Sequence, residues 1–455
     1  MHDDTQRADM ACTPSKAVPR RAFLKAAAAA GAGLVILPSG VVTGADSPNN
    51  KLNIAMIGAG GRARAHYGTA QKENIAALCD VDEQHLAQAA KKFPSAKTYA
   101  DWRKCLDQKD LDAVICCTTD HTHAFVSSWA LNRDLHLYCE KPMGITVNEV
   151  RLLREKWLKK QDKLATQQGT QRHQHPNFNR VRELIVDGAI GELKAAWAWG
   201  NRKLPRPGYL EGKGTPPKHL NYDLWLGPAP YHPYNPGYFR GCLGWNEYRD
   251  FGAGQVGDMG SHTMDLVWNA IDAGPPTSAE ATGEKVNPDT IPVRITATWD
   301  VPKNDWRPGI TVTWCMGGDM PKSPKGYVDL KKIGHGAMFK GDKGFVVCDF
   351  QSRLLLPWGP TADFSYYNKR PKEKMIPDLG HFQEDWITSC KDPSRKTACD
   401  YKYSGDMMEM MLLGLVAHRV GKKLEYDPKA GRITNLPEAN KYLTKDYRND
   451  WVLDG

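Results

Sequence analysis

The stretch KLNIAMIGAGGRA, residues 51–63, decides the fold of the first half of the chain. Its first seven residues alternate and then run apolar, which is typical of a buried strand. The turn that follows has the form G-x-G-x-x-A and leads into an expected helix. Glycines let the backbone approach a pyrophosphate closely, and the helix start offers it free N–H groups. The stretch therefore predicts a dinucleotide site whose contacts are Gly58, Gly60, Gly61, Arg62 and Ala63.

Short apolar segments alternate with helical stretches over the next hundred residues. The expected strands are 75–78, 113–117, 135–139 and 164–166, and the expected helices include 83–92 and 147–160. This alternation predicts a parallel, doubly wound sheet, an α/β Rossmann domain over residues 51–170.

The second half of the chain has a different character. Its expected strands are 193–200, 294–299, 311–315 and 345–348, followed by an amphipathic helix over 404–422. Long Pro/Gly-rich connections separate them, and the connection 201–248 is long enough for a lid, a binding surface or an interface. A chain of 455 residues has room for two cores, so residues 171–455 are expected to form a second domain with a mixed or antiparallel sheet.

The N-terminus has the pattern of an export signal. Arg20 and Arg21 precede an apolar run, 26–37, that is too short to span a membrane as a mature helix. Residues 1–45 are therefore predicted to be a twin-arginine signal peptide that is cut after Ala45. We expect a periplasmic protein without stable membrane insertion once the signal is removed.

Composition excludes some partners and some kinds of site. The formal net charge is +9, but Lys and Arg are scattered among acids, so nucleic acid is not an expected partner. The 11 cysteines have no repeated metal-knuckle spacing and do not indicate a disulfide framework. Export of a folded protein from the reducing cytoplasm is consistent with unpaired cysteines.

Two further turns are expected at the cofactor edge of the sheet. Asp80 ends the second strand, where an acid can accept hydrogen bonds from ribose hydroxyls. This favours NAD, with NADP as the alternative because Arg62 and Arg64 are close in sequence. The turn from Thr118 ends another strand, and its His121 and His123 are interpreted as cofactor contacts or helix caps.

Candidates for the chemistry of a carbinol follow later in the chain. Oxidation needs a proton acceptor and a cation that stabilises alkoxide character. Lys141, in the tripeptide Glu140-Lys141-Pro142, projects from the carboxyl edge of the sheet. Asp258 and His262 are one helical turn apart, so the carboxylate is expected to fix the imidazole and raise its pKa. The pair could also form a cap or bind a metal.

Together these motifs resemble the Gfo/Idh/MocA family of oxidoreductases, to which glucose-fructose oxidoreductase and inositol dehydrogenase belong. The resemblance spans most of the chain after residue 50 and depends on the order and spacing of the motifs. They are the glycine turn at 58, residues 79–82, 119–123, 140–142, 222–230 and 254–265. It implies a Rossmann domain followed by an open-faced, mainly antiparallel sheet that often serves for oligomerisation, here into a homodimer or homotetramer.

The resemblance also implies roles for individual residues. Lys141 would bind the substrate hydroxyl, His262 would be the acid/base, and Asp258 would orient it and contact the substrate. Glu140 and Lys141 would also contact the cofactor, and the Lys141–Pro142 bond would be cis. Arg172 matches a segment near the nicotinamide, and Trp245, in a loop before the catalytic segment, is expected to be a platform for a sugar.

Four functions remain open at this point. The leading one is NAD(P)-dependent oxidation of a sugar, polyol or glycoside by an enzyme that holds its cofactor tightly, because free NAD(P) is scarce outside the cytoplasm. A redox-neutral, NAD-dependent glycosidase is the second. A hydrolase with a metal on His121 and His123, or on His173 and His175, is less well supported, so no metal ligand is predicted. The last is a non-catalytic sugar-binding protein.

Overall fold

The computed structural model describes residues 50–324, 328–360, 362–448 and 451–455. The segment predicted to be a twin-arginine signal, residues 1–45, lies outside the described residues. Residues 52–455 form one compact unit, to which all that follows refers. None of the helices in the described residues combines the length and apolar character needed to cross a membrane.

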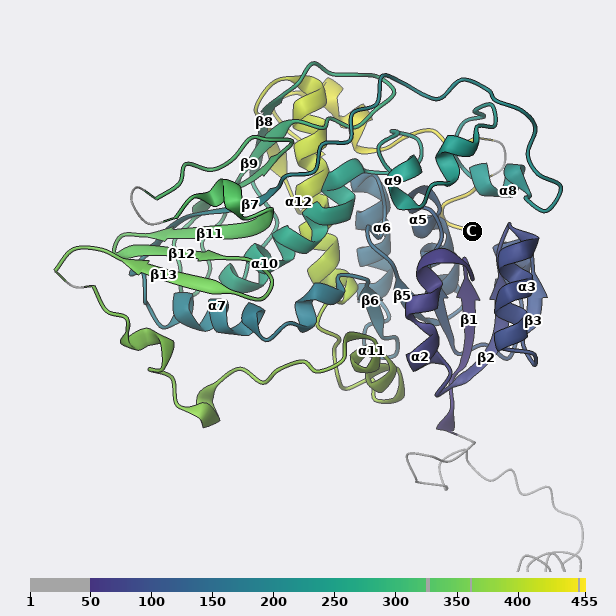
Figure 1. The fold of residues 1–455 in the computed structure, drawn as a ribbon, viewed down its shortest axis with the longest axis horizontal. Coiled ribbons are helices and arrows are strands. Elements are labelled where there is room, and N and C mark those ends of the chain that lie inside the picture. Colours follow the sequence, from purple (N-terminus) through teal and green to yellow (C-terminus); the bar gives the residue numbers. More distant parts are fainter. Residues whose placement is uncertain (1–49, 325–327, 361, 449–450) are drawn as a thin grey trace, which may run out of the picture. The chain divides into compact units, whose positions relative to one another are not determined.

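The first domain contains the predicted parallel, doubly wound sheet (Figure 1). Its strand order is β3-β2-β1-β4-β5-β6. The strands are β1 (Asn53–Ile57), β2 (Asn74–Cys79), β3 (Lys97–Tyr99), β4 (Ala113–Cys116), β5 (His136–Cys139) and β6 (Thr166–Gln168). From β1 the chain builds the sheet toward one edge, through β2 and β3, and then returns to build it toward the other edge, from β4 on. In such sheets ligands bind at the carboxyl ends of the two strands where the order reverses, here β1 and β4. The glycine turn after β1 and Thr118 after β4 flank this point.

Helices cover both faces of this sheet, and local capping fixes where they begin. Asp82 accepts hydrogen bonds from the backbone of Gln84 and His85, which starts α3. Thr146 and Glu149 form a capping box at the start of α6. The helices are α2 (Tyr67–Ala70), α3 (Glu83–Lys92), α4 (Trp102–Leu106), α5 (Asp120–Asn132) and α6 (Val147–Leu158).

The second sheet has nine strands, in the order β13-β12-β11-β7-β10-β9-β8-β14-β15. Only β7 and β10 pair in parallel, so the sheet is mixed and mostly antiparallel, as predicted. Its strands are β7 (Leu193–Gly200), β8 (Ser278–Gly283), β9 (Ile295–Val301), β10 (Ile310–Met316), β11 (His335–Gly341), β12 (Gly344–Cys348), β13 (Arg353–Pro357), β14 (Leu424–Asp427) and β15 (Arg432–Ile433).

The helices α7 (Asn177–Val186), α10 (Ser261–Ile271) and α12 (Tyr401–Val420) pack against strands of the nine-stranded sheet. The other helices of the second half are α8 (Tyr222–Leu226), α9 (Cys242–Trp245) and α11 (Phe382–Lys391). The amphipathic helix predicted over 404–422 is α12, but it is buried on nearly all sides. It lies between α6 of the first domain and strands β8 and β9 (Figure 1), so it has no broad solvent face.

Residues between 382 and 399 complete the hydrophobic core of the first domain, here called the first core. Phe382 and Trp386 of α11 are buried against side chains of the parallel sheet. The side chain of Gln167 in β6 donates a 2.7 Å hydrogen bond to the carbonyl of Phe382, and the backbone N–H of Gln168 donates to the carbonyl of Cys399 at 2.9 Å. The first core therefore includes residues far beyond the predicted boundary at 170.

Candidate active site

The glycine turn packs closely against the residues that follow β2 and β4. Gly58 has φ +79°, and a Cβ at this position would lie 2.7 Å from the carbonyl oxygen of Cys117. The backbone N–H of Gly60 donates a 2.9 Å hydrogen bond to Oδ2 of Asp80. The helix expected after the turn is only a short 3-10 turn, Gly61–Ala65, followed by the four-residue α2.

A cavity of about 300 Å³ lies over the carboxyl edge of the parallel sheet. From the first domain it is lined by Gly58, Gly60, Gly61, Arg62, Asp80, Thr118, Asp120, His123, Glu140 and Lys141, among others. From the long connection 201–248, here called the covering loop, it is lined by Leu220, Leu224, Trp225, Phe239, Gly241, Cys242 and Trp245. Most of the expected cofactor residues and Trp245 thus share one cavity, whereas Ala63 and His121, both buried, are absent from its lining.

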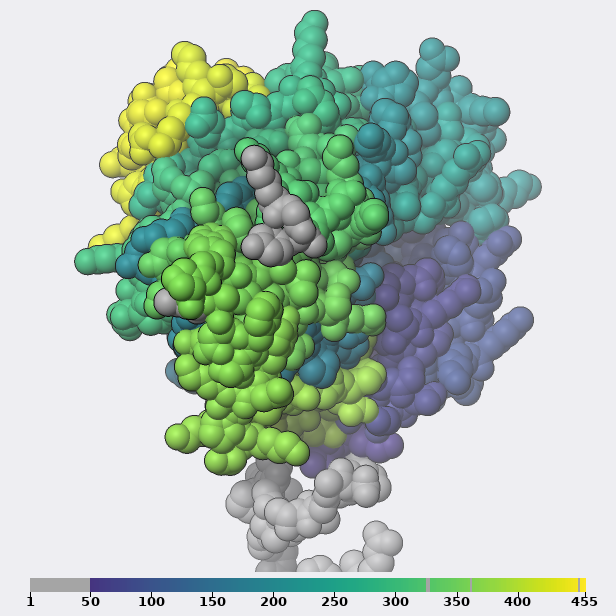
Figure 2. All heavy atoms as spheres, turned by 60° about the vertical axis from the view of Figure 1, so that its left-hand side comes forward, coloured from purple at the N-terminus to yellow at the C-terminus, as the bar shows by residue number. Residues whose placement is uncertain are grey.

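The covering loop is fastened to the first domain beside Asp80. The backbone N–H of Asn221 donates to the carbonyl of Val81 at 2.8 Å, and that of Glu83 donates to the carbonyl of His219 at 2.8 Å. The ring of His219 lies 3.0 Å from the carboxylate of Asp82. In Figures 1 and 2 the teal loop lies above the purple and blue first domain. The loop therefore roofs the cavity from the second half of the chain.

Glu140 lines the cavity and contacts the side chains of Arg62 and His66. Its Oε1 accepts a 2.8 Å hydrogen bond from Arg62 and lies 2.9 Å from Nε2 of His66. Burial alone would raise the pKa of Glu140, but the hydrogen bonds and charges of His66 and Arg62 outweigh it and lower the pKa to about 2. The carboxylate is thus ionised and holds Arg62 next to the glycine turn.

His121 and His123, which follow β4, both contact backbone carbonyls from other parts of the chain. His121 lies outside the cavity lining, with its ring nitrogens 3.1 Å from the carbonyl of Trp225 and 3.3 Å from that of Phe251. The structure thus does not place it among the cofactor-contacting residues. Burial lowers its pKa to about 4. It joins α5 to the covering loop and binds a carbonyl in the last turn of α8, in agreement with the alternative prediction of a helix cap.

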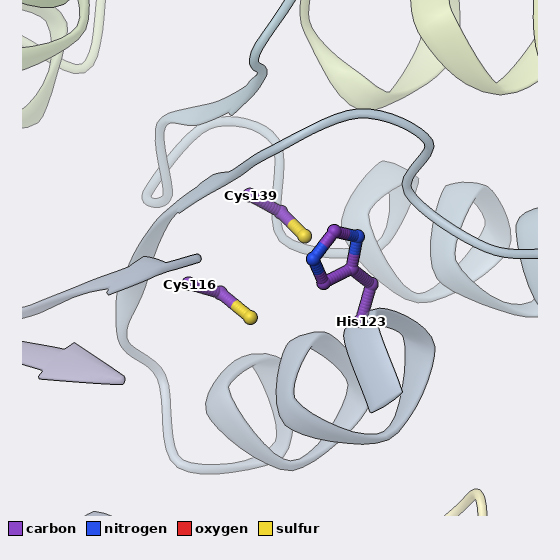
Figure 3. A group of neighbouring side chains, drawn as sticks. All are labelled: Cys116, His123 and Cys139. Carbon is purple, nitrogen blue, oxygen red and sulfur yellow. The ribbon is translucent and has the colours of Figure 1, made fainter. Parts of the chain in front are cut away.

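His123 lines the cavity, yet both of its ring nitrogens face backbone carbonyls. They lie 2.7 Å from the carbonyl of Pro142 and 3.0 Å from that of Thr118. Its ring lies beside the sulfur atoms of Cys116 and Cys139 (Figure 3). These carbonyls stand where a metal would have to bind, so the geometry gives no support to a metal on His121 and His123. In the other pair, Nδ1 of His173 lies 2.9 Å from Asp265.

Lys141 connects the cavity with the second domain. The Lys141–Pro142 bond is cis, as predicted. Nζ of Lys141 donates a 2.6 Å hydrogen bond to Oδ1 of Asp258, and Arg202 donates a 2.6 Å hydrogen bond to Oδ2. Burial would lower the pKa of Lys141, but the negative charges of Asp258 and Asp120 outweigh it and raise the pKa. Lys141 is therefore a protonated, well-positioned cation at the end of the cavity.

The predicted pairing of Asp258 with His262 is wrong. Both carboxylate oxygens of Asp258 are directed at cations, and Nδ1 of the buried His262 has no hydrogen-bond partner in the described residues. Burial, followed by the positive charge of Lys141, lowers the pKa of His262 to about 3 instead of raising it. Asp258 lies in a π-helical turn over Val256–Gly260, and its carboxylate is bound by Lys141 and Arg202 instead.

Arg172 and the remaining candidates flank this cluster. The guanidinium of Arg172 stacks on Phe350 at 4.4 Å and lies within the electrostatic field of Arg202 and Asp258. Arg202 was missed in the sequence; its only signal is a position two residues after β7. Asp120, also missed as a site residue, is fully buried, and burial raises its pKa to about 7.

Two family models match the chain. The first, described as an oxidoreductase family with an NAD-binding Rossmann fold, matches residues 52–168. The second, the C-terminal alpha/beta domain of the same family, matches residues 197–313. The predicted NAD-binding domain is thereby confirmed, and the glycine cradle, Asp80 and the cavity fit that dinucleotide.

Similar curated proteins are sugar and polyol dehydrogenases. The myo-inositol 2-dehydrogenase of Thermotoga maritima is 28% identical over 149 residues, which are 31% of this chain and 42% of that protein. The levoglucosan dehydrogenase of Pseudarthrobacter phenanthrenivorans is 22% identical over 228 residues, 48% of this chain and 50% of that protein. The chain thus spans half or less of the length of these relatives.

Solved structures share the fold across both domains. A WlbA dehydrogenase from Chromobacterium violaceum, solved with NADH and UDP-GlcNAcA, has a TM-score of 0.59 at 16% identity and covers 87% of this chain and 99% of its own. Levoglucosan dehydrogenase with NADH has a TM-score of 0.53 at 16% identity, covering 82% and 98%. With both family models matched in order and this fold, the chain belongs to the Gfo/Idh/MocA family of oxidoreductases.

Proposed function

We propose that this protein is an enzyme that oxidises the CH–OH group of a sugar, polyol or glycoside with NAD. The observation that carries the proposal is the position of Lys141. Its side chain lines the dinucleotide cavity, and its Nζ is held by Asp258 at 2.6 Å on the side of the second domain. A hydroxyl bound at Nζ would therefore sit between the cavity and the second sheet.

The side chains around Lys141 can move a proton from that hydroxyl. NAD, when bound, supplies the hydride acceptor. The Lys141 ammonium donates to the substrate oxygen and stabilises negative charge as it develops there. His262 is neutral because burial lowers its pKa to about 3, and its unpaired Nδ1 is therefore able to accept a hydrogen bond from the hydroxyl. We propose that the imidazole takes the proton only as negative charge develops on the substrate oxygen, which would raise the pKa of His262. Asp258 and Arg202 hold the ammonium in place.

We also propose that NAD stays bound between turnovers. The covering loop supports this, because three contacts fasten residues 219–221 to the segment 81–83 next to Asp80. Release of a dinucleotide would require these contacts to open. The predicted export supports it too, since an exported enzyme would need to keep its cofactor.

The test uses the full chain purified from a host that exports it. After denaturation, close to one NAD or NADH per chain is expected in the released fraction. Turnover on a panel of sugars and polyols should be lost in Lys141→Ala and His262→Ala. An oxidised product indicates an oxidoreductase, whereas a cleaved glycoside without net oxidation indicates the glycosidase. Protein that neither contains nor binds NAD would refute the proposal.

Localisation and assembly are part of the same proposal. The sequence pattern of residues 1–45 supports twin-arginine export to the periplasm, which substitution of Arg20 and Arg21 by Lys should abolish. The face of the second sheet opposite α10 and α12 carries the partly buried Trp197 and Phe345, which supports a homodimer or homotetramer through this face. Light scattering on the purified chain tests the assembly.

A further inference from the structure

Positive side chains gather on the side of Lys141 that faces the second domain. Lys141 is part of the cavity lining, whereas Asp258, Arg202 and Arg172 are not. The chain of contacts runs from Lys141 to Asp258 and on to Arg202, whose charge in turn lowers the pKa of Arg172 after the larger effect of burial. If the proposed function holds, the part of the substrate beyond the reacting hydroxyl extends toward these arginines.

The negative charges around this cluster do not balance the positive ones. Lys141 and Arg202 both bind the carboxylate of Asp258, whose pKa is lowered because these two cations outweigh burial, and its charge also acts on Arg172. Asp120, whose pKa burial raises to about 7, is the second carboxyl group that acts on Lys141, so three cations face two carboxyl groups. The site therefore has a surplus of positive charge before any ligand binds.

Arg172 has no anionic partner within the described residues. Its guanidinium is partly buried and stacks on Phe350, with no carboxylate or carbonyl in the described chain at hydrogen-bond distance. The more buried arginines Arg151 and Arg154, by contrast, both bind Glu409, at 2.7 and 2.6 Å. The donors of Arg172 are not among the buried unpaired atoms, so solvent reaches them and they are available to an anion that arrives with a ligand.

Two buried imidazole nitrogens beside the arginines are also unpaired. Nδ1 of His262 and Nδ1 of His335 have no hydrogen-bond partner in the described residues, and His262 is only 3% exposed. His335 begins β11 opposite Gly200, and the charges of Arg202 and Arg172 act on it. Neutral imidazoles can bind hydroxyl groups. Anion-binding arginines next to hydroxyl-binding imidazoles match a sugar that carries an acidic group.

We propose that the substrate of this site is an anionic sugar or polyol whose carboxylate or phosphate is bound by Arg172 and Arg202. This deepens the proposed function and depends on it. The dinucleotide's own phosphates do not account for Arg172, because the glycine turn and Arg62 lie at the cavity, and Arg172 is not part of its lining. The planar guanidinium suits either anion through two parallel hydrogen bonds.

The test measures binding by calorimetry on the NADH-loaded full chain. The probes are D-glucose, D-glucuronate and D-glucose 6-phosphate, with D-galactose and D-galacturonate as a second set. We expect an anionic probe to bind at least about 10-fold more tightly than its neutral parent, as one charge-assisted hydrogen-bonded contact would give. The tighter of the two anions identifies the group as a carboxylate or a phosphate.

Variants assign the effect to Arg172. Arg172→Met should remove most of the preference for the anion over its neutral parent, and Arg172→Lys should restore part of that preference. Arg419→Met is the matched control, because Arg419 stacks on Tyr442 at 4.2 Å in a similar way, outside this site. It should bind like the wild type.

Three outcomes would overturn the inference. The first is binding in which no anion exceeds its neutral parent, including no binding by any probe. The second is a preference that Arg172→Met leaves unchanged, and the third is a loss of NADH affinity in that variant, which would assign Arg172 to the cofactor. Oxidation of neutral polyols by wild-type protein without any preference for anions would leave the proposed function standing while the inference fails.

Discussion

Replacing Asp258 by Asn should cost both stability and activity. Its carboxylate accepts 2.6 Å hydrogen bonds from Lys141 and Arg202, and the side chains of Asp258 and Lys141 are 8% and 16% exposed. A charge-assisted hydrogen bond of this kind contributes about 1.5–3 kcal/mol. Arg202 is 36% exposed, so its share is only about 0–1 kcal/mol. D258N should therefore lower the free energy of unfolding by about 2–4 kcal/mol.

The same substitution should change the alkaline pH dependence of the enzyme. Asp258 is the strongest influence raising the pKa of Lys141 against burial, so its loss should lower that pKa. Because the ammonium is the active form, the alkaline limb of kcat/KM should move to lower pH, and kcat should fall by about 100-fold or more. Urea unfolding followed by fluorescence and a kcat/KM profile measure the two effects.

Asp272→Asn is the matched control for D258N. Asp272 also accepts hydrogen bonds from an arginine, Arg182, at 2.5 and 2.6 Å, but its side chain is 46% exposed. Solvent screening limits the loss there to about 0–1 kcal/mol. If both variants lose the same stability, or if D258N keeps the alkaline limb of the wild type, the reasoning about the buried Lys141–Asp258 pair is refuted.

Three further predictions concern the glycine turn and the residues around Lys141. Gly58→Ala should abolish NAD binding in calorimetry, because its Cβ would lie 2.7 Å from the carbonyl oxygen of Cys117 and φ is +79°; wild-type affinity would contradict this. Asp120→Asn should shift the alkaline limb of kcat/KM to lower pH, less than D258N does, because Asp120 ranks after Asp258 in raising the pKa of Lys141; a shift to higher pH would be inconsistent with that charge. His262, with a pKa lowered to about 3, should stay neutral from pH 5 to 8. An acid limb near the ordinary histidine value of about 6.5 that disappears in His262→Gln would show otherwise.

The sequence predicted the first domain well because its signals are local. Apolar runs such as 113–117 are buried on both faces of a parallel sheet, and the turn at Gly58 must be glycine for reasons of φ and space. Strands of the second sheet were missed where the pattern is weak. Strand β11 contains Gly336 and Gly341, and β8 consists of small and polar residues, so only pairing with neighbouring strands stabilises them.

The sequence identified several residues of the site but not which side chains contact one another there. Lys141 and Asp258 were identified, but the partner of Asp258 depends on which side chains the fold brings near it. Arg202 is 56 residues away in sequence, and its position follows from the register of β7 in the second sheet. The π-helical turn at Val256–Gly260 leaves no mark in a spacing rule that assumes an α-helix.

His121 illustrates the same limit at the cofactor edge. Its place after β4 suggested a cofactor contact, yet its ring reaches the carbonyls of Trp225 and Phe251, which are 104 and 130 residues further along the chain. A long loop that folds back over the first domain decided its role. Sequence reasoning could flag the length of that loop but not where it would be fastened.

A single turnover followed at 340 nm tests directly whether Lys141 assists the transfer of hydride from the substrate to NAD. Full-length protein loaded with NAD would be mixed with an excess of a sugar or polyol that the wild type oxidises. One NADH per chain should appear with wild-type protein, whereas Lys141→Met should bind NAD but form NADH at least about 100-fold more slowly. Equal rates of NADH formation in the two proteins would contradict the assignment of this chemistry to Lys141.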